Sequence, residues 1–239
     1  MPITATVQAI LDSATTELGL PLIVFGVTSY DQTGRQATAM LQAIGDDLVR
    51  SHDWQFLEKS HTFVGDGNSS SFALPADYGR VVNQTQWSVS NQRPMTGPVS
   101  AQVWGWCQYG IVSAGFYFRY RILDNRLHVF PTPGAGQEFA FFYITKNWVI
   151  SGDTSQPKDT ISLANDVPMF DRRLMTSGLK ARLWGQKGFD TTQVQAEFNY
   201  VLNSEKGISQ AAPELSLTGC TTGILINEYN VPDGSWEVN

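Results

Sequence analysis

The stretch FYFRYRILDNRLHVFP, residues 116–131, contains the clearest hairpin signal in this chain. It contains two strand-like runs joined by Asp-Asn, a dipeptide that tolerates the positive φ angles of a tight turn. In the first run, Phe116, Phe118, Tyr120 and Ile122 alternate with Tyr117, Arg119, Arg121 and Leu123. This period of two predicts a β-hairpin with one apolar face and one largely polar face, as on a half-buried sheet.

The sequence around this hairpin has the same character. Residues 55–150 hold 18 of the 28 aromatic side chains of the chain, an enrichment typical of β packing. The runs HTFV and SFAL flank GDGNSS, residues 65–70, which predicts a second hairpin. EFAFFYITKNWV predicts a further strand, and SAQVWGWCQY predicts a short helix with Ser100 as its N-cap.

Helical periodicity appears on both sides of this region. Residues 7–18 and 33–51 repeat apolar side chains at helical spacing, with Thr4 or Thr6 as the first N-cap. Gly45 either weakens the second helix or lets another helix approach closely. Two more helices are expected after residue 163, one capped by Asn165 or Asp166 with Pro168 in its first turn, and one capped by Asp190 or Thr191.

The predicted fold class is therefore α+β: a bundle of about four helices with an inserted antiparallel β-sheet or β-sandwich module and an extended C-terminal tail. Residues 1–54 and 163–207 would form a discontinuous helical domain, and residues 55–150 the β-rich insert. Residues 151–162 are expected to be a polar linker. Residues 208–239, rich in Pro, Gly, Ser and Thr, are expected to be a tail ordered only by a partner.

Composition narrows the range of functions. The net charge of −6 argues against a nucleic-acid-binding surface, which would normally be basic. The acidic excess lies in residues 1–54 and 207–239, whereas residues 55–150 carry five acids and seven bases. Neither a secretory signal nor a run long enough to span a membrane is apparent. Cys107 and Cys220 fit two free thiols better than one disulfide.

The sequence contains no recognisable catalytic signature. A Walker-type loop, a GxSxG elbow and an HExxH helix are all missing, so we expect no enzymatic activity, no cofactor and no catalytic or metal-binding residues. The spacing of His52, His61 and His128 matches no zinc template. Asp46, Asp47 and Asp53 are expected to form a solvated or partner-facing side of a helix, because their spacing does not bring all three together.

Several aromatic, basic and apolar side chains are candidates for a protein–protein interface. The tryptophans Trp87, Trp104 and Trp106 are expected to be core or interface anchors, with a glycan-stacking platform as the alternative. Arg119 and Arg121 lie on one strand face and are expected to form cross-strand or intersubunit salt bridges. In the tail, the candidate contact residues are Ile224, Leu225, Ile226, Tyr229 and Trp236.

The order of these segments resembles a known family. DWQFLEKSHTF, FALPADYGRVV, RPMTGPVSAQVW, FRYRILDNRLHVFPTP and FAFFYITKNWV, followed by the helical RRLMTSGLKARLWGQKGFD, are similar to head-to-tail adaptor proteins of tailed bacteriophages. Within these adaptors, the likeness is to the tail tubular protein A, or gatekeeper, of short-tailed phages. It covers about residues 33–206 and rests on segment order rather than on a catalytic signature.

The resemblance implies a structural virion protein at the head-tail junction, assembled in the bacterial cytoplasm. It implies a dodecameric ring between the portal protein and the tail tube or nozzle protein, with double-stranded DNA passing through the lumen without specific binding. It further implies no cofactor and no membrane association. A non-enzymatic glycan-binding or tail-surface β module is the alternative.

Overall fold

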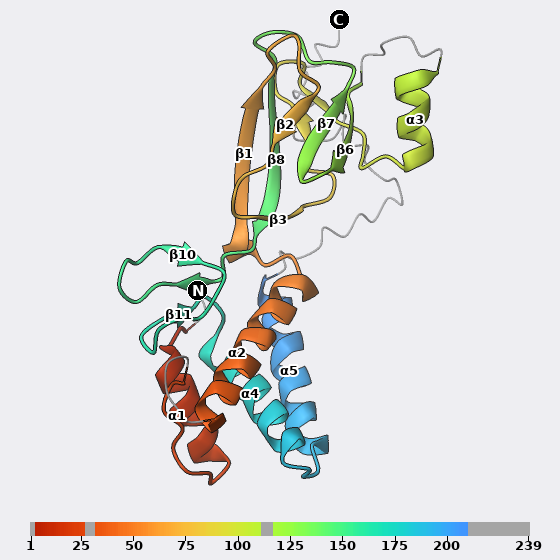
Figure 1. Ribbon diagram of the computed structural model, residues 1–239. Helices are drawn as coiled ribbons and strands as arrows, with labels where there is room; N and C mark the ends of the chain where they lie inside the picture. The colour runs from red at the N-terminus through yellow and green to blue at the C-terminus, as the bar shows by residue number, and fades with distance from the viewer. Residues whose placement is uncertain (1–2, 27–31, 111–116, 210–239) are drawn as a thin grey trace, which may run out of the picture.

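The computed structural model describes residues 3–26, 32–110 and 117–209. These residues form an elongated molecule, with a body of four helices at one end and a β module at the other (Figure 1). The chain enters the β module after the second helix and returns to the helical body before the last two. The predicted α+β class, with a helical bundle and an inserted antiparallel β module, is confirmed.

The helical body consists of α1 (Val7–Glu17), α2 (Gln32–Ser51), α4 (Arg172–Gln186) and α5 (Thr192–Ser209). The first helix begins as predicted, because the side chain of Thr6 accepts a hydrogen bond from the backbone N–H of Ala9. Apolar stripes from these helices meet in one core. Its buried members include Ile10, Leu11, Ala37, Leu41, Ile44, Leu48, Leu174, Met175, Leu179 and Leu183.

The β module contains two antiparallel sheets. In the larger sheet, β1 (Glu58–Val64) pairs along its full length with β8 (Glu138–Thr145). The short strands β3 (Tyr78–Val81), β4 (Trp87–Ser88) and β5 (Arg93–Pro94) complete it. The smaller sheet has the order β2 (Ser71–Ala73), β7 (Arg126–Phe130), β6 (Arg119–Leu123). The module has its own core, with Met95, Phe118, Tyr120, Leu127, Val129, Phe139, Phe141 and Tyr143 buried.

The hairpin predicted around Asp-Asn is confirmed. Strand β6 pairs with β7 from Arg119↔Phe130 to Leu123↔Arg126. Asp124 and Asn125 have φ angles of 50° and 55°, as a two-residue turn of the type I′ family requires. The predicted apolar face is also confirmed for Phe118 and Tyr120, which are buried, whereas Phe116 lies outside the described residues.

The hairpin predicted at GDGNSS is wrong. Strand β1 pairs with β8 and strand β2 with β7, so this loop crosses from one sheet to the other. Phe63 and Phe72, at the two ends of the crossing, place their rings against each other in the module core, with centroids 4.6 Å apart. A period of two identifies strands but does not identify their partners.

The cap predicted at Asn165 or Asp166 is also wrong. Helix α4 is capped by Asp171, which accepts a hydrogen bond from the Arg173 N–H at 2.8 Å. Pro168 lies instead in the strand β11 (Val167–Pro168), which pairs with β9 (Val149–Ile150). With β10 (Pro157–Lys158) these strands form a small sheet in the region where the sequence predicts a linker.

Asp166 organises that small sheet. Its side chain is fully buried and accepts hydrogen bonds from the backbone N–H groups of Gly152, Ser162 and Leu163. It also pairs with Lys158 at 2.6 Å. Burial alone would raise the pKa of Asp166, but these partners outweigh it and lower the pKa below its ordinary value. The carboxylate therefore stays charged inside the fold and holds the loop to the strands.

Trp148 joins the β module to the helical body. The side chain is 1% exposed, and its indole N–H donates to Asp46 Oδ1 at 3.2 Å. A Cβ added to Gly45 would lie 2.1 Å from the Trp148 ring, so this glycine makes room for an aromatic ring and not for a neighbouring helix. The fold thus needs a small residue at that turn of α2.

Lys180 connects three helices. It is 7% exposed, and its ammonium group contacts Glu17 of α1 at 2.7 Å and Glu197 of α5 at 2.8 Å. Burial alone would lower the pKa of Lys180, but the two carboxylates outweigh it and raise the pKa above its ordinary value. The ammonium group is therefore charged at every pH near neutrality.

Replacing Lys180 by methionine is expected to lower the free energy of unfolding by about 1–3 kcal/mol, since Glu17 and Glu197 would lose their shared partner. Arg182→Met is the matched control, because the ion pair of Arg182 with Asp47 is largely exposed and should contribute less than about 1 kcal/mol. Urea denaturation measures both variants. Equal losses would show that burial of Lys180 adds nothing to its ion pairs.

Candidate functional site

The helix α3 (Ala101–Tyr109) lies against the outer face of the smaller sheet, on one side of the β module (Figure 1). Ser100 caps it as predicted, with its side chain accepting from the Val103 N–H. The α3 side chains that face the sheet, Trp104 and Cys107, are buried. The Trp104 ring meets the His128 ring of β7 edge-on, with centroids 6.3 Å apart. The helix is therefore anchored on the sheet by one side only.

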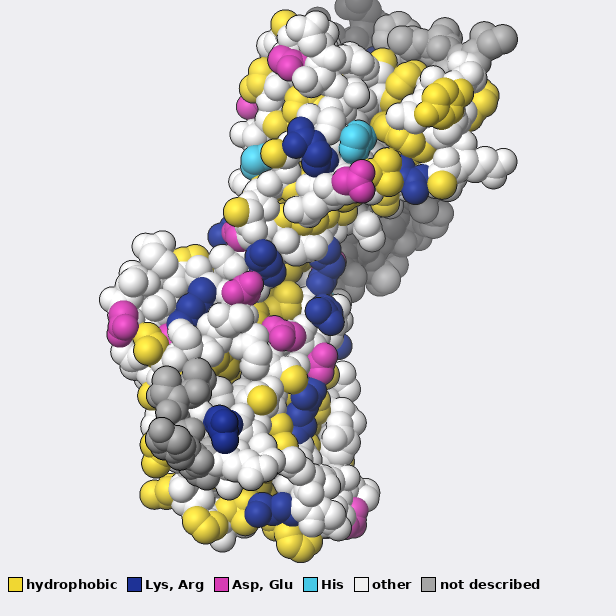
Figure 2. Space-filling view, viewed as in Figure 1, with side chains coloured by type: hydrophobic (Ala, Val, Ile, Leu, Met, Phe, Trp, Pro, Cys, Tyr) yellow, Lys and Arg dark blue, Asp and Glu magenta, His cyan; other side chains and the backbone are white. Residues whose placement is uncertain are grey.

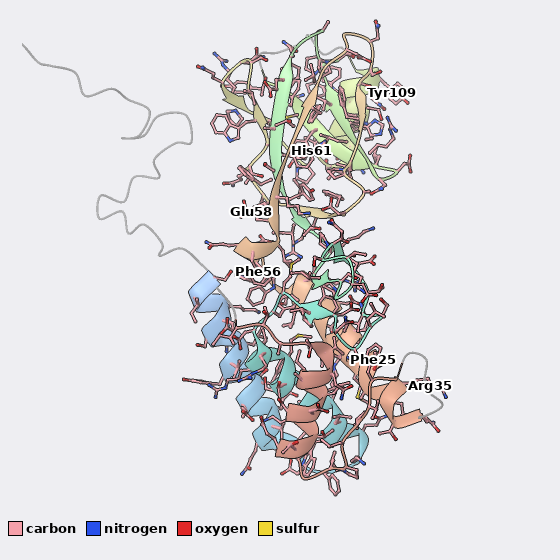
Figure 3. All side chains as sticks on the ribbon, turned by 90° about the vertical axis from the view of Figure 1, so that its left-hand side faces the viewer. Phe25, Arg35, Phe56, Glu58, His61 and Tyr109 are labelled. Carbon is pink, nitrogen blue, oxygen red and sulfur yellow. The ribbon has the colours of Figure 1, made fainter. Side chains whose placement is uncertain are left out.

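The other side of α3 is exposed and apolar. Val103 is 39% exposed, Trp106 54% and Tyr109 88%. We call these three residues the α3 face. Figure 2 shows hydrophobic side chains gathered over this part of the β module, with basic and histidine side chains beside them. Figure 3 shows Tyr109 at the same end of the molecule, far from Arg35 of the helical body.

Three arginine side chains lie on the outer face of the smaller sheet, and one of them contacts the α3 face. Arg119 donates to Cys107 Sγ at 3.2 Å, and its guanidinium carbon lies 5.8 Å from the centroid of the Trp106 ring. Arg121 follows two residues later on the same face of β6, opposite His128 of β7. Arg126 donates to Ser71 Oγ at 2.7 Å. We call Arg119, Arg121 and Arg126 the arginine cluster.

The structure brings together part of the predicted interface. Arg119 lies over the Trp106 ring, Trp104 lies on the other side of α3 against His128, and Arg121 lies two residues beyond Arg119 on the same face of β6. Trp87 is not part of it, since it lies on β4 of the other sheet and pairs with Pro94 and Ala140. The remaining candidates, Ile224, Leu225, Ile226, Tyr229 and Trp236, lie outside the described residues.

The structure bears on the predicted glycan platform of the tryptophans and on the predicted salt bridges of the arginines. Of the three tryptophans proposed as a glycan platform, Trp104 is buried and Trp87 is half-buried in another sheet, so only Trp106 offers an open ring. Within residues 3–26, 32–110 and 117–209, no ion pair involves Arg119 or Arg121. The intersubunit alternative for these arginines stays a prediction.

A second exposed surface lies on α5 and was missed at the sequence level. This helix has 18 residues, yet only Val201 is fully buried. Tyr200 is 69% exposed and Ile208 74%. Beside α5 runs a groove of about 330 Å³ between α2, α4 and α5, lined in part by Ile44, Leu48, Phe198 and Leu202. The apolar spacing of α5 was visible in the sequence, but its incomplete cover was not.

A cleft of about 390 Å³ lies where the helical body meets the β module. Trp54, Phe56, Phe170 and Leu174 supply apolar walls, and Ile3 and Ile208 lie at its edges. Figure 3 shows Phe56 at this junction. Burial and the nearby Asp171 carboxylate raise the pKa of Glu205, which also lines the cleft. The cleft therefore disfavours further negative charge.

Asp46, Asp47 and Asp53 each have a different partner and do not form a cluster. Asp46 accepts from Trp148, Asp47 pairs with Arg182, and Asp53 pairs with Arg80. In the described part of the chain, no three His, Cys, Asp or Glu side chains are grouped so as to hold a metal ion. Among the same residues, no helix combines the length and apolar character needed to cross a lipid bilayer.

Comparison with models of known protein families gives a match to this chain. The model of the SU10 adaptor protein family matches residues 5–211, which include all four helices of the body and the whole β module. A search of curated proteins finds no match.

Proposed function

The chain belongs to the SU10 adaptor protein family, and from this membership we propose that it is a structural virion component joining the head of a tailed bacteriophage to its tail. The observation that carries the proposal is the family match over residues 5–211. The adaptor would contact the portal protein on one side and the tail tube or nozzle protein on the other. It would have no enzymatic activity and would need no cofactor.

We further propose that the chain forms a homo-oligomeric ring of twelve copies, through which the viral DNA passes. The incompletely covered helix α5 supports this, because only one of its 18 residues is fully buried and its exposed side carries Tyr200 and Ile208 among polar residues, which leaves surface for a neighbouring subunit. A ring needs two different surfaces that fit each other, so that contacts close on themselves. The α5 side and the groove beside it provide candidates for the helical part.

The charge distribution supports a passive channel. The chain has a net charge of −6, and like charges repel the DNA phosphates, so DNA could pass without being held. In this proposal the helices form the ring and the β module carries the contact with the tail. Assembly would take place in the cytoplasm of the host bacterium.

No separate observation favours the glycan-binding alternative. Its three tryptophans do not share one open surface, since Trp104 is buried and Trp87 lies on a different sheet from α3. The adaptor proposal therefore has no rival of equal support in the described geometry.

The double variant Tyr200→Lys with Ile208→Lys is expected to stay folded and to lose assembly with portal protein at least tenfold, because it places two charges on the exposed side of α5. Val64→Lys is the matched control, an exposed apolar residue at the end of β1 in the other part of the molecule. Sedimentation velocity of mixtures with portal protein measures the assembled fraction. Full assembly of the double variant would remove α5 from the interface.

A further inference from the structure

The outer face of the β2–β7–β6 sheet is positively charged. Arg119, Arg121 and Arg126 lie on the side of the sheet opposite Tyr120, Leu127 and Val129, whose side chains fill the module core. None of the three strands contains an Asp or Glu. The arginine cluster therefore has no carboxylate on its own sheet.

The hydrogen-bond donors around this face are incompletely paired. Nη1 of Arg121 and Nε1 of Trp104 are both buried and have no hydrogen-bond partner in the described part of the chain. No member of the arginine cluster forms an ion pair there either. The arginine cluster thus has no carboxylate partner among the described residues, and the guanidinium groups at the surface are suited to a carboxylate from another segment.

Apolar and cationic surface lie side by side here. The guanidinium group of Arg119 lies over the Trp106 ring of the α3 face, and Tyr109 extends the apolar strip along the same helix. A segment that fits this surface must carry apolar side chains and a carboxylate a few residues apart.

Residues 210–239 have this composition. They contain Glu214, Glu228, Asp233 and Glu237 and no Lys, Arg or His. Within them, the run Ile224-Leu225-Ile226 stands two residues before Glu228, which Tyr229 follows. The segment thus complements the face both in charge and in the spacing of apolar and acidic groups.

The end of α5 allows this segment to reach the face. Ser209, the last residue of α5, accepts a hydrogen bond from the Gln55 N–H at 3.4 Å, which places it where the helical body meets the β module. The 19 residues from Ser209 to Glu228 span at most about 60–70 Å when extended. The longest strand of the module, β8, has eight residues and is about 27 Å long.

We propose that residues 210–239 dock on the β module of their own chain, with the run Ile224–Ile226 against the α3 face and Glu228 at the arginine cluster. The acidic segment covers the exposed aromatic side chains and supplies the carboxylate that the arginine cluster lacks among the described residues. This contact is independent of the proposed assembly with portal protein, since it requires one chain only.

Disulfide trapping in the full chain tests the contact. In a Cys107→Ala background, Tyr109→Cys places a thiol on the α3 face, and Cys220 supplies the only other thiol. Mild oxidation should form an intrachain disulfide between positions 109 and 220 at least tenfold faster than between position 220 and a Leu22→Cys control, an exposed site at the helical body. Mass spectrometry of the digested protein identifies the pair.

Charge variants test whether the arginine cluster binds residues 210–239 electrostatically. Arg119→Gln with Arg126→Gln should slow trapping at least fivefold, and raising the salt concentration from about 0.05 M to about 0.5 M should do the same. The matched control is Arg35→Gln with Arg50→Gln on α2, which removes the same charge from the helical body and should leave the rate within about twofold. Glu228→Gln should slow trapping as well, without altering the described fold.

Three results would overturn the proposal. One is equal trapping at positions 109 and 22. Another is trapping that is indifferent to the arginine variants and to salt. The third is a disulfide that forms between chains and not within one, detected by mixing a Tyr109→Cys, Cys220→Ser chain with a chain that keeps only Cys220; the segment would then belong on a second copy.

Discussion

Replacing Trp148 by alanine is expected to lower the free energy of unfolding by about 3–5 kcal/mol. The side chain is 1% exposed and packs directly over Gly45, where a Cβ would lie 2.1 Å from the ring. It also contacts Phe170, with ring centroids 6.0 Å apart, and donates to Asp46. Its removal would leave a cavity between the second helix and the segment that returns from the β module.

Chemical denaturation measures this loss, and Trp106→Ala is the matched control. Trp106 is 54% exposed and has the Arg119 guanidinium over its ring, so its removal should lower stability by no more than about 1 kcal/mol. Gly45→Val should destabilise the protein by several kcal/mol, because the added side chain would displace the same indole ring. If Trp148→Ala and Trp106→Ala proved equally stable, Trp148 would not join the two parts of the molecule.

Replacing Asp166 by alanine is expected to lower the free energy of unfolding by about 3–5 kcal/mol, which is the usual effect of breaking a buried ion pair from one side. The variant would leave Lys158 with the Ser162 hydroxyl but without its carboxylate partner, and three backbone N–H groups without their acceptor. The carbonyl of Asp166 also accepts from the Val7 N–H at the start of α1. Loss of the side chain should therefore loosen both the small sheet and the first helix.

Asp166 also predicts how stability depends on pH. Its pKa in the folded protein lies below the ordinary aspartate value of about 3.9, so its contribution is complete above that value and is lost as pH falls through the lower folded pKa. Asp166→Ala should accordingly show a shallower loss of stability in acid. Asp159→Ala is the control, since Asp159 is exposed in the same loop and should matter by about 0.5 kcal/mol or less. An unchanged acid slope in Asp166→Ala would contradict the assignment.

The sequence predicted elements better than pairings. Apolar spacing located the helices, and Asp124-Asn125 identified the β6–β7 hairpin, because both signals are local. The partners of β1 and β2 could not be predicted, since alternation does not encode which strand lies alongside. Asp166 resembled a helix cap because aspartate accepts backbone N–H bonds equally well in a loop.

The candidate interface could be predicted only where it depends on local sequence patterns. The sequence indicates a short helix at α3 and an alternating strand at β6, and Trp106 of the one meets Arg119 of the other. The separation of Trp87 from them depends on sheet topology, which no local pattern contains. The exposed side of α5 depends on what its neighbours leave uncovered, and this too is a property of the whole fold.

Electron microscopy of the purified chain mixed with its portal protein would show whether the proposed ring forms. We expect closed rings of this chain stacked on the same axis as the portal ring, with the helical body forming the ring wall and the β module projecting from it. A chain that stays a 26.4 kDa monomer with and without portal protein would rule out the adaptor ring.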